Sequence, residues 1–218
     1  MKVRKLLISA LLLMAASPLC AAASPFTAGE ASYCAIGKSS PFAAGVEWGA
    51  NAMVYASVDR NYIDRAGSRV DASSRGLSFY LNGTLRAFAG VYAGGKLRFD
   101  LGTGYIGLAD SRREIPLTLR ANYLAGGRNA DGAVLFLDGG AGFSTVSSGV
   151  VGILGAAGAG YRMHMAEGSG LSFLFNLRFA TDRPGIIYPD GMGFVPAGDI
   201  RNNAAEYLSA GISISVDF

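Results

Sequence analysis

The feature that most constrains the fold is an alternation of apolar and polar residues that recurs along most of the chain. Between Val46 and Val58 every even-numbered residue is apolar, whereas Glu47 and Ser57 stand at odd-numbered positions. Successive side chains of a β-strand point to opposite faces, so a period of two predicts a strand with one apolar face. We expect this face, which ends with Ala56 and Val58, to point outward.

Seven further segments show the same alternation. In all eight, ionised residues lie only on the face opposite the apolar one. An Arg side chain that faces lipid at the bilayer midplane costs about 2–4 kcal/mol, which explains so strict a segregation. The predicted strands are residues 46–58, 77–93, 97–105, 115–123, 133–145, 151–163, 171–179 and 207–218.

The composition places these strands in a membrane. Half of the residues are hydrophobic, yet no apolar run after the N-terminal segment is long enough for a membrane-spanning helix. In lipid, only helices and closed barrels satisfy every backbone N–H and C=O group. We therefore predict an all-β fold, an antiparallel up-and-down transmembrane β-barrel of eight strands over residues 45–218. The alternative is a soluble β-sandwich or secreted barrel, whose polar face would be rich in Lys rather than in Gly, Ser, Asn and Arg.

The first 22 residues read as a signal peptide. Two lysines and an arginine precede an apolar run at residues 6–16, and small residues follow at 21–23, which predicts cleavage near 22/23. The apolar run is shorter than the roughly 20 residues that a transmembrane helix needs. Residues 23–44 have no clean period, and we expect a leader that lies in the periplasm or in the lumen.

Several kinds of chemistry are disfavoured. Cys20 has the depth of a lipid-attachment cysteine, but Pro18 and Leu19 precede it instead of a small residue. After the signal peptide, Cys34 is the only cysteine and His164 the only histidine, so neither an intramolecular disulfide nor a His/Cys zinc site is expected. The nearly balanced charge does not suggest nucleic acid as a partner. We expect no metal and no cofactor.

The charges on the inner face form the main candidate site. The interior of an eight-stranded barrel is just wide enough for side chains to fill, and buried charges survive only when they are paired. We therefore predict an interlocked network of arginines and carboxylates that plugs the lumen. The alternative is a gated pore whose net positive lining favours anions. The nine residues are Glu47, Arg86, Arg98, Asp100, Arg120, Asp138, Arg162, Arg178 and Asp217.

The chain ends in an aromatic residue that follows alternating apolar residues. The positions concerned are Ala210, Ile212, Ile214, Val216 and Phe218. This ending resembles the last strand of bacterial outer-membrane barrels. With the signal peptide and the eight segments, it makes the chain similar to the small eight-stranded outer-membrane proteins of the OmpA/OmpX-like or OmpW-like superfamily. The resemblance implies an outer-membrane protein in contact with membrane lipid, whose last strand is recognised by the barrel-assembly machinery. No binding residue of that superfamily can be assigned to this sequence.

The connections suggest where a ligand would bind. If the N-terminus is periplasmic, the long connections 59–74 and 181–203 are extracellular, and the pair Gly94-Gly95 forms the first periplasmic turn. We expect a non-enzymatic barrel with a structural or surface-interaction role, and these two connections are its candidate ligand-binding loops. One alternative is a narrow channel for small or hydrophobic solutes, as the OmpW-like resemblance implies. Another is a lipid-modifying hydrolase, which would rest on His164 alone.

Overall fold

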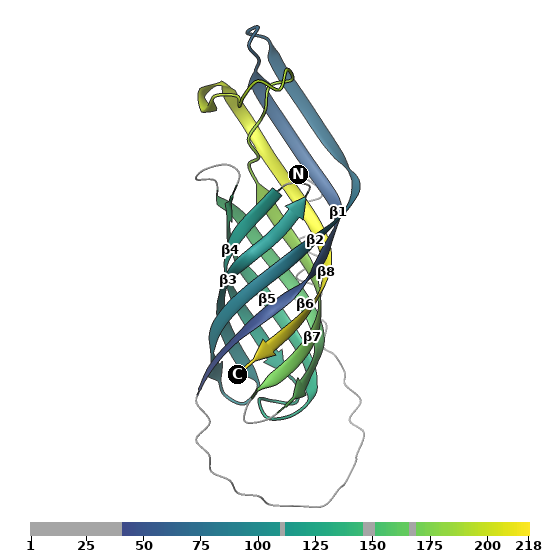
Figure 1. Cartoon of the computed structure of the whole chain (residues 1–218), viewed down its shortest axis with the longest axis vertical. Helices are drawn as coiled ribbons and strands as arrows, with labels where there is room; N and C mark the ends of the chain where they lie inside the picture. The colour runs from purple at the N-terminus through teal and green to yellow at the C-terminus, as the bar shows by residue number, and fades with distance from the viewer. Residues whose placement is uncertain (1–40, 110–111, 146–150, 166–168) are drawn as a thin grey trace, which may run out of the picture. The chain divides into compact units, whose positions relative to one another are not determined.

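The structure is a computed structural model that describes residues 41–109, 112–145, 151–165 and 169–218. The predicted signal peptide with Cys20, and the leader up to residue 40 with Cys34, lie outside the described residues. Eight strands run in chain order, each antiparallel to the next, and the last pairs with the first (Figure 1). They are β1 (Phe42–Ile63), β2 (Arg69–Ala93), β3 (Leu97–Ala109), β4 (Arg112–Leu124), β5 (Gly132–Ser144), β6 (Val151–His164), β7 (Gly170–Asp182) and β8 (Ile200–Asp217).

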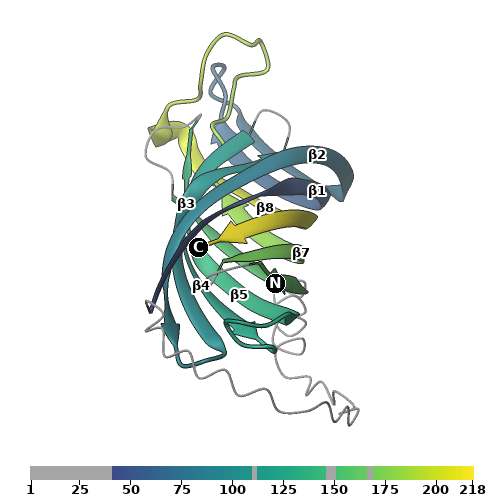
Figure 2. The ribbon, with the colours of Figure 1, turned by 60° about the horizontal axis from the view of Figure 1, so that its bottom comes forward.

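The sheet closes on itself, so the fold is the predicted all-β, eight-stranded up-and-down barrel. The ring of strands is visible in Figure 2. The C-terminus of the chain lies at the end of the barrel that carries the short turns between β2 and β3 and between β4 and β5 (Figure 1). The first of these turns falls between Ala93 and Leu97, as the Gly94-Gly95 pair predicts. Gly94 has a φ of 82°, a left-handed conformation that costs a glycine little and other residues more.

The two faces of the strands differ as the alternation predicts. The outer face carries exposed apolar side chains on every strand, for example Leu81, Leu119 and Ile153, which are 79%, 59% and 65% exposed. The predicted inner charges are buried. An exposed apolar surface around a whole barrel is stable in lipid rather than in water. No helix among the described residues is long and apolar enough to cross a membrane.

Three strands continue past the others on one side. β1, β2 and β8 have 22, 25 and 18 residues, whereas the other five have 13 or 14. We call the projecting parts, residues 59–63, 69–75 and 200–204, the extension (Figure 1). β2 pairs with β3 only from Thr84 onward, so in the extension β2 pairs with β1 alone among the described strands.

The extension corrects the prediction of a long loop at 59–74. The strands continue to Ile63 and restart at Arg69, so that only residues 64–68 connect them. The alternation of apolar and polar residues fails in the strand parts within 59–74, because a sheet in water needs no apolar outer face. The second long connection is an actual loop, which covers residues 183–199 and includes a short 3-10 helix at Ala197–Asp199.

A β-bulge in β1 changes which side chains face inward. The pairing of β1 with both neighbours shifts between Met53 and Tyr55. A bulge adds one residue to a strand and inverts the facing beyond it. Ala56 and Val58 consequently pack against buried interior residues, whereas the unbroken alternation predicts them on the outer face. The buried interior residues of this cluster are Met53, Ile106, Leu108, Leu154, Ala180, Ala205 and Tyr207.

Candidate functional site

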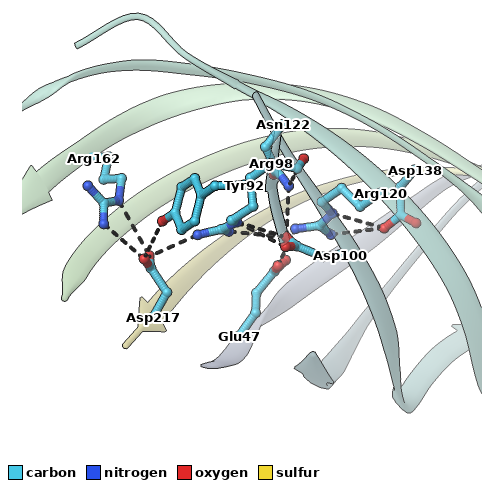
Figure 3. A network of polar contacts seen from close by, with 9 residues as sticks. All are labelled: Glu47, Tyr92, Arg98, Asp100, Arg120, Asn122, Asp138, Arg162 and Asp217. Carbon is cyan, nitrogen blue, oxygen red and sulfur yellow. Dashed lines mark hydrogen bonds and ion pairs between the residues drawn. The ribbon is translucent and has the colours of Figure 1, made fainter. Parts of the chain in front are cut away.

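The lumen near the turn end contains one closed group of charges. Arg98 Nε lies 2.9 Å from Asp100 Oδ1, and Arg98 Nη1 lies 3.1 Å from Asp217 Oδ2. Arg162 Nη2 contacts the same Asp217 oxygen at 2.9 Å (Figure 3). The amide of Asn122 donates to Asp100 Oδ2 at 2.7 Å. Two cations and two carboxylates thus neutralise each other, and Asp217 links the last strand to β3 and β6.

A second group lies in the middle of the lumen around Arg120. Its Nε and Nη2 atoms donate to Asp138 Oδ2 at 3.1 and 3.0 Å, and its Nη1 atom donates to Glu47 Oε2 at 2.5 Å. The other oxygen of Glu47 accepts a hydrogen bond from Ser213 Oγ at 2.9 Å. The guanidinium also lies 4.3 Å from the ring centroid of Phe136. One arginine therefore joins β1, β4 and β5 across the barrel (Figure 3).

Seven of the nine predicted lumen charges belong to these two groups, and two do not. Arg86 and Arg178 are each only 7% exposed, and neither forms an ion pair with a described residue. All three guanidinium nitrogens of Arg86 and Nη1 of Arg178 lack a hydrogen-bond partner in the described part of the chain. Arg86 packs against Phe88, with 5.3 Å between the guanidinium carbon and the ring centroid. Gly102 provides the space for this guanidinium, because a Cβ at that position would collide with it.

A third group lies at the other end of the lumen and includes residues that sequence reasoning missed. Arg112 Nη1 contacts Asp182 Oδ2 at 3.1 Å. Glu114 is 1% exposed, and neither of its carboxylate oxygens has a partner among the described residues. The predicted connection 181–203 includes Asp182, and the predicted strand 115–123 leaves out Glu114. The missed signal is the alternation itself, which continues inward from Arg120 through Thr118 to Glu114.

The lumen is almost filled. The cavity inside the barrel has a volume of about 20 Å³, enough for about one water molecule. Its walls include Glu47, Arg86, Thr118, Asp138 and Arg178. This cavity therefore has no room for a larger organic solute beside the network.

The imidazole Nδ1 atom of His164 is buried and has no hydrogen-bond partner among the described residues. Its backbone N–H donates to Asp131 Oδ1 at 2.7 Å. Arg162 is paired with Gly132, the first residue of β5, so His164 lies beyond the end of β5. Among the described residues, no group of three or more His, Cys, Asp or Glu side chains could hold a metal ion.

The loop 183–199 is fastened to the extension at a second polar site. Arg65 Nη1 contacts Asp190 Oδ2 at 3.0 Å, and Arg65 Nη2 donates to the carbonyl of Met192. The guanidinium carbon of Arg65 lies 4.7 Å from the ring centroid of Tyr188. Beneath this contact, three apolar side chains are buried against one another: Tyr62, Ile186 and Val195.

The outer side of the same loop exposes apolar side chains. An isolated β-bridge joins Ile187 to Phe194. These two residues and Met192 are 55%, 60% and 69% exposed. We call these three residues the tip patch. The loop thus buries one apolar side on the extension and presents a second one outward.

The comparisons with known proteins give little beyond the fold. No family model matches the chain, and no curated protein matches it. The crystal structure of Neisserial surface protein A is similar over 80% of this chain and 96% of that chain, with 17% sequence identity and a TM-score of 0.32. A similarity this distant says nothing about the activity or the partners of this chain.

Proposed function

We propose that the protein is a non-enzymatic outer-membrane barrel that presents a docking surface for an extracellular protein partner. The observation that carries the proposal is the tip patch, Ile187, Met192 and Phe194, in the loop 183–199, which Figure 1 shows beside the extension. Large apolar side chains that stay exposed on an ordered surface mark interaction sites. Aromatic residues and Met are enriched in protein interfaces.

The tip patch is held in place before any partner binds. Arg65 fixes the loop through Asp190 and the Met192 carbonyl, and Tyr62 anchors it from below. A surface that is already ordered loses less conformational entropy on binding, and therefore binds more tightly for the same contacts.

The free edge of β2 in the extension is a less favourable docking site. Exposed charges line it at Arg69, Asp71 and Arg75. Charged side chains on an edge strand oppose the addition of another strand. We therefore assign docking to the tip patch and not to strand addition along β2.

Three features support the outer-membrane placement. The outer face is apolar all around the barrel, the chain begins with a predicted signal peptide, and it ends with the alternating apolar residues before Phe218. We propose that the barrel-assembly machinery reads this last strand and that outer-membrane lipid covers the apolar belt. In this orientation the extension is extracellular and the short turns are periplasmic.

A narrow channel remains the second candidate function because Arg86 and Arg178 have no ion-pair partner beside the cavity. Planar-bilayer recording distinguishes the two functions. We expect the purified barrel to give no discrete conductance steps, because the paired charges fill the lumen. Regular steps with anion selectivity would favour the channel and contradict a plugged barrel.

The docking function can be tested with peptides selected for binding. A phage-displayed peptide library is selected against the wild-type protein in lipid nanodiscs. The selected peptides are then tested on a variant that carries Ile187→Ser, Met192→Ser and Phe194→Ser. We expect the selected peptides to bind the triple variant at least about tenfold more weakly than the wild type, equivalent to about 1.4 kcal/mol. Arg65→Ala should also weaken binding, because it releases the loop.

The matched control is Met165→Ser. Met165 is 50% exposed and follows β6 at the opposite end of the barrel, so its replacement should leave peptide binding unchanged. Selected peptides that bind the triple variant as tightly as the wild type would contradict a docking role of the tip patch.

A further inference from the structure

The middle of the lumen carries more positive than negative charge. Three arginines lie there, Arg86, Arg120 and Arg178, together with two carboxylates, Glu47 and Asp138. The group at the turn end is neutral, with two arginines and two carboxylates. One positive charge in the middle group therefore has no carboxylate in contact with it, and the unpaired acid Glu114 belongs to the third group at the other end of the lumen. A buried charge without a partner is costly, which requires that something compensate it.

The two carboxylates cannot supply the missing partner because their oxygens are mostly in use. Glu47 faces Arg86 directly in the pairing of β1 with β2, yet its oxygens accept from Arg120 and Ser213. Asp138 uses Oδ2 for Arg120, and only its Oδ1 has no partner. Glu114, the remaining unpaired acid of the described lumen, contacts neither Arg86 nor Arg178.

The hydrogen-bond groups at the cavity also lack acceptors. Arg86 Nε, Nη1 and Nη2 and Arg178 Nη1 are buried donors without a described partner. Asp138 Oδ1 and the hydroxyl of Thr118 are the unpartnered oxygens in the cavity wall. Guanidinium nitrogens only donate hydrogen bonds, so the missing ligand must accept them.

The size of the cavity limits the ligand to a very small one. A volume of about 20 Å³ suits one water molecule or one monatomic ion better than sulfate, phosphate or an organic carboxylate. A water molecule would accept hydrogen bonds but would leave the positive charge uncompensated. We propose that the barrel binds one small monovalent anion, chloride, in the cavity lined by Arg86 and Arg178. The anion balances the charge of the middle group and stabilises the closed barrel.

Unfolding experiments at constant ionic strength test this site. The refolded barrel in detergent is unfolded thermally in mixtures of sodium chloride and sodium gluconate, because gluconate is too large for the cavity. Above the Kd, we expect the unfolding midpoint to rise with the logarithm of the chloride concentration, and to be about 5–10 °C higher at 100 times the Kd than without chloride. Arg86→Met and Arg178→Met should each remove the chloride dependence. In gluconate alone, Arg86→Met should be at least as stable as the wild type, because it removes an unpaired buried charge.

Arg69→Met is the matched control, since Arg69 is exposed on the extension. This variant should keep the full chloride dependence. Crystals of the wild type soaked in bromide provide a second measurement that requires no variant to fold. An anomalous peak beside Arg86 and Arg178 supports the site. Coinciding unfolding curves in chloride and gluconate, a chloride effect that Arg86→Met retains, or a cavity without a bromide peak would each overturn the proposal.

Discussion

Arg120→Met is expected to lower the free energy of unfolding by about 3–5 kcal/mol, the largest loss from any single lumen substitution. Arg120 is the only described cation within ion-pair distance of either Glu47 or Asp138. Without it, two carboxylates stay buried in the lumen with no cation in contact. The loss can be measured by urea unfolding of the barrel refolded into lipid vesicles, followed by the fluorescence of Trp48, the single tryptophan.

An exposed ion pair serves as the control for this experiment. Arg75 Nη2 lies 3.6 Å from Asp59 Oδ2 on the extension, where both side chains are exposed. Arg75→Met should cost less than about 1 kcal/mol, because exposed ion pairs contribute little. If Arg120→Met cost no more than Arg75→Met, the charges of the lumen would not hold the barrel together.

Leu119→Arg is expected to cost about 2–4 kcal/mol, because it places a charge on the outer face of β4. Leu119 is flanked by buried inward side chains at Thr118 and Arg120, so the new arginine cannot turn into the lumen without a shift of the strand. The same unfolding measurement in vesicles gives the loss.

The comparison for Leu119→Arg is Ser73→Arg. Ser73 is exposed on β2 in the extension, outside the apolar belt, so an arginine there should leave the free energy of unfolding nearly unchanged. If both variants unfolded at the same urea concentration, the outer face of β4 would be in contact with water and not with lipid.

The sequence was sufficient to predict the strands that cross the membrane. Each of them has one lipid face and one lumen face, so physical chemistry imposes the same alternation on all eight. Phe99 and Leu101 on one side of β3, with Arg98 and Asp100 on the other, show how directly this pattern gives the facing. The inversion beyond Met53 could not be predicted, because a bulge next to a run of small and apolar residues leaves no trace in the composition.

The extension was not predictable for a related reason. Its strands lie outside the apolar belt, where both faces tolerate polar residues, so Asp59 and Ser74 read as parts of a loop. Their pairing with each other's strand depends on contacts between β1 and β2, not on a pattern within either strand. The position of Arg65 against Asp190 is likewise a product of the fold, since 125 residues separate them in the chain.

The lumen network was predictable as a set but not as a list of pairs. The alternation within each strand places all nine charged residues inside the barrel. The register between strands and the length of each side chain decide which of them form ion pairs. Arg120 reaches Glu47 and Asp138, and thereby leaves Arg86 without a carboxylate although Glu47 faces it. Glu114 falls outside the predicted strand because that strand begins at residue 115, three residues after the start of β4 at Arg112.

In a membrane-embedded barrel the side chains of each strand alternate between lipid and lumen. A scan of β7 tests this alternation most directly. Nitroxide labels are placed one at a time at residues 171–177 of the barrel in vesicles, and their accessibility to oxygen is measured. The structure predicts a period of two, with high oxygen accessibility at Phe173 and Phe175 and low accessibility at Ser172, Leu174 and Asn176. Accessibility that is uniform along the strand, or highest for a water-soluble nickel complex at Phe173 and Phe175, would contradict a membrane-embedded barrel.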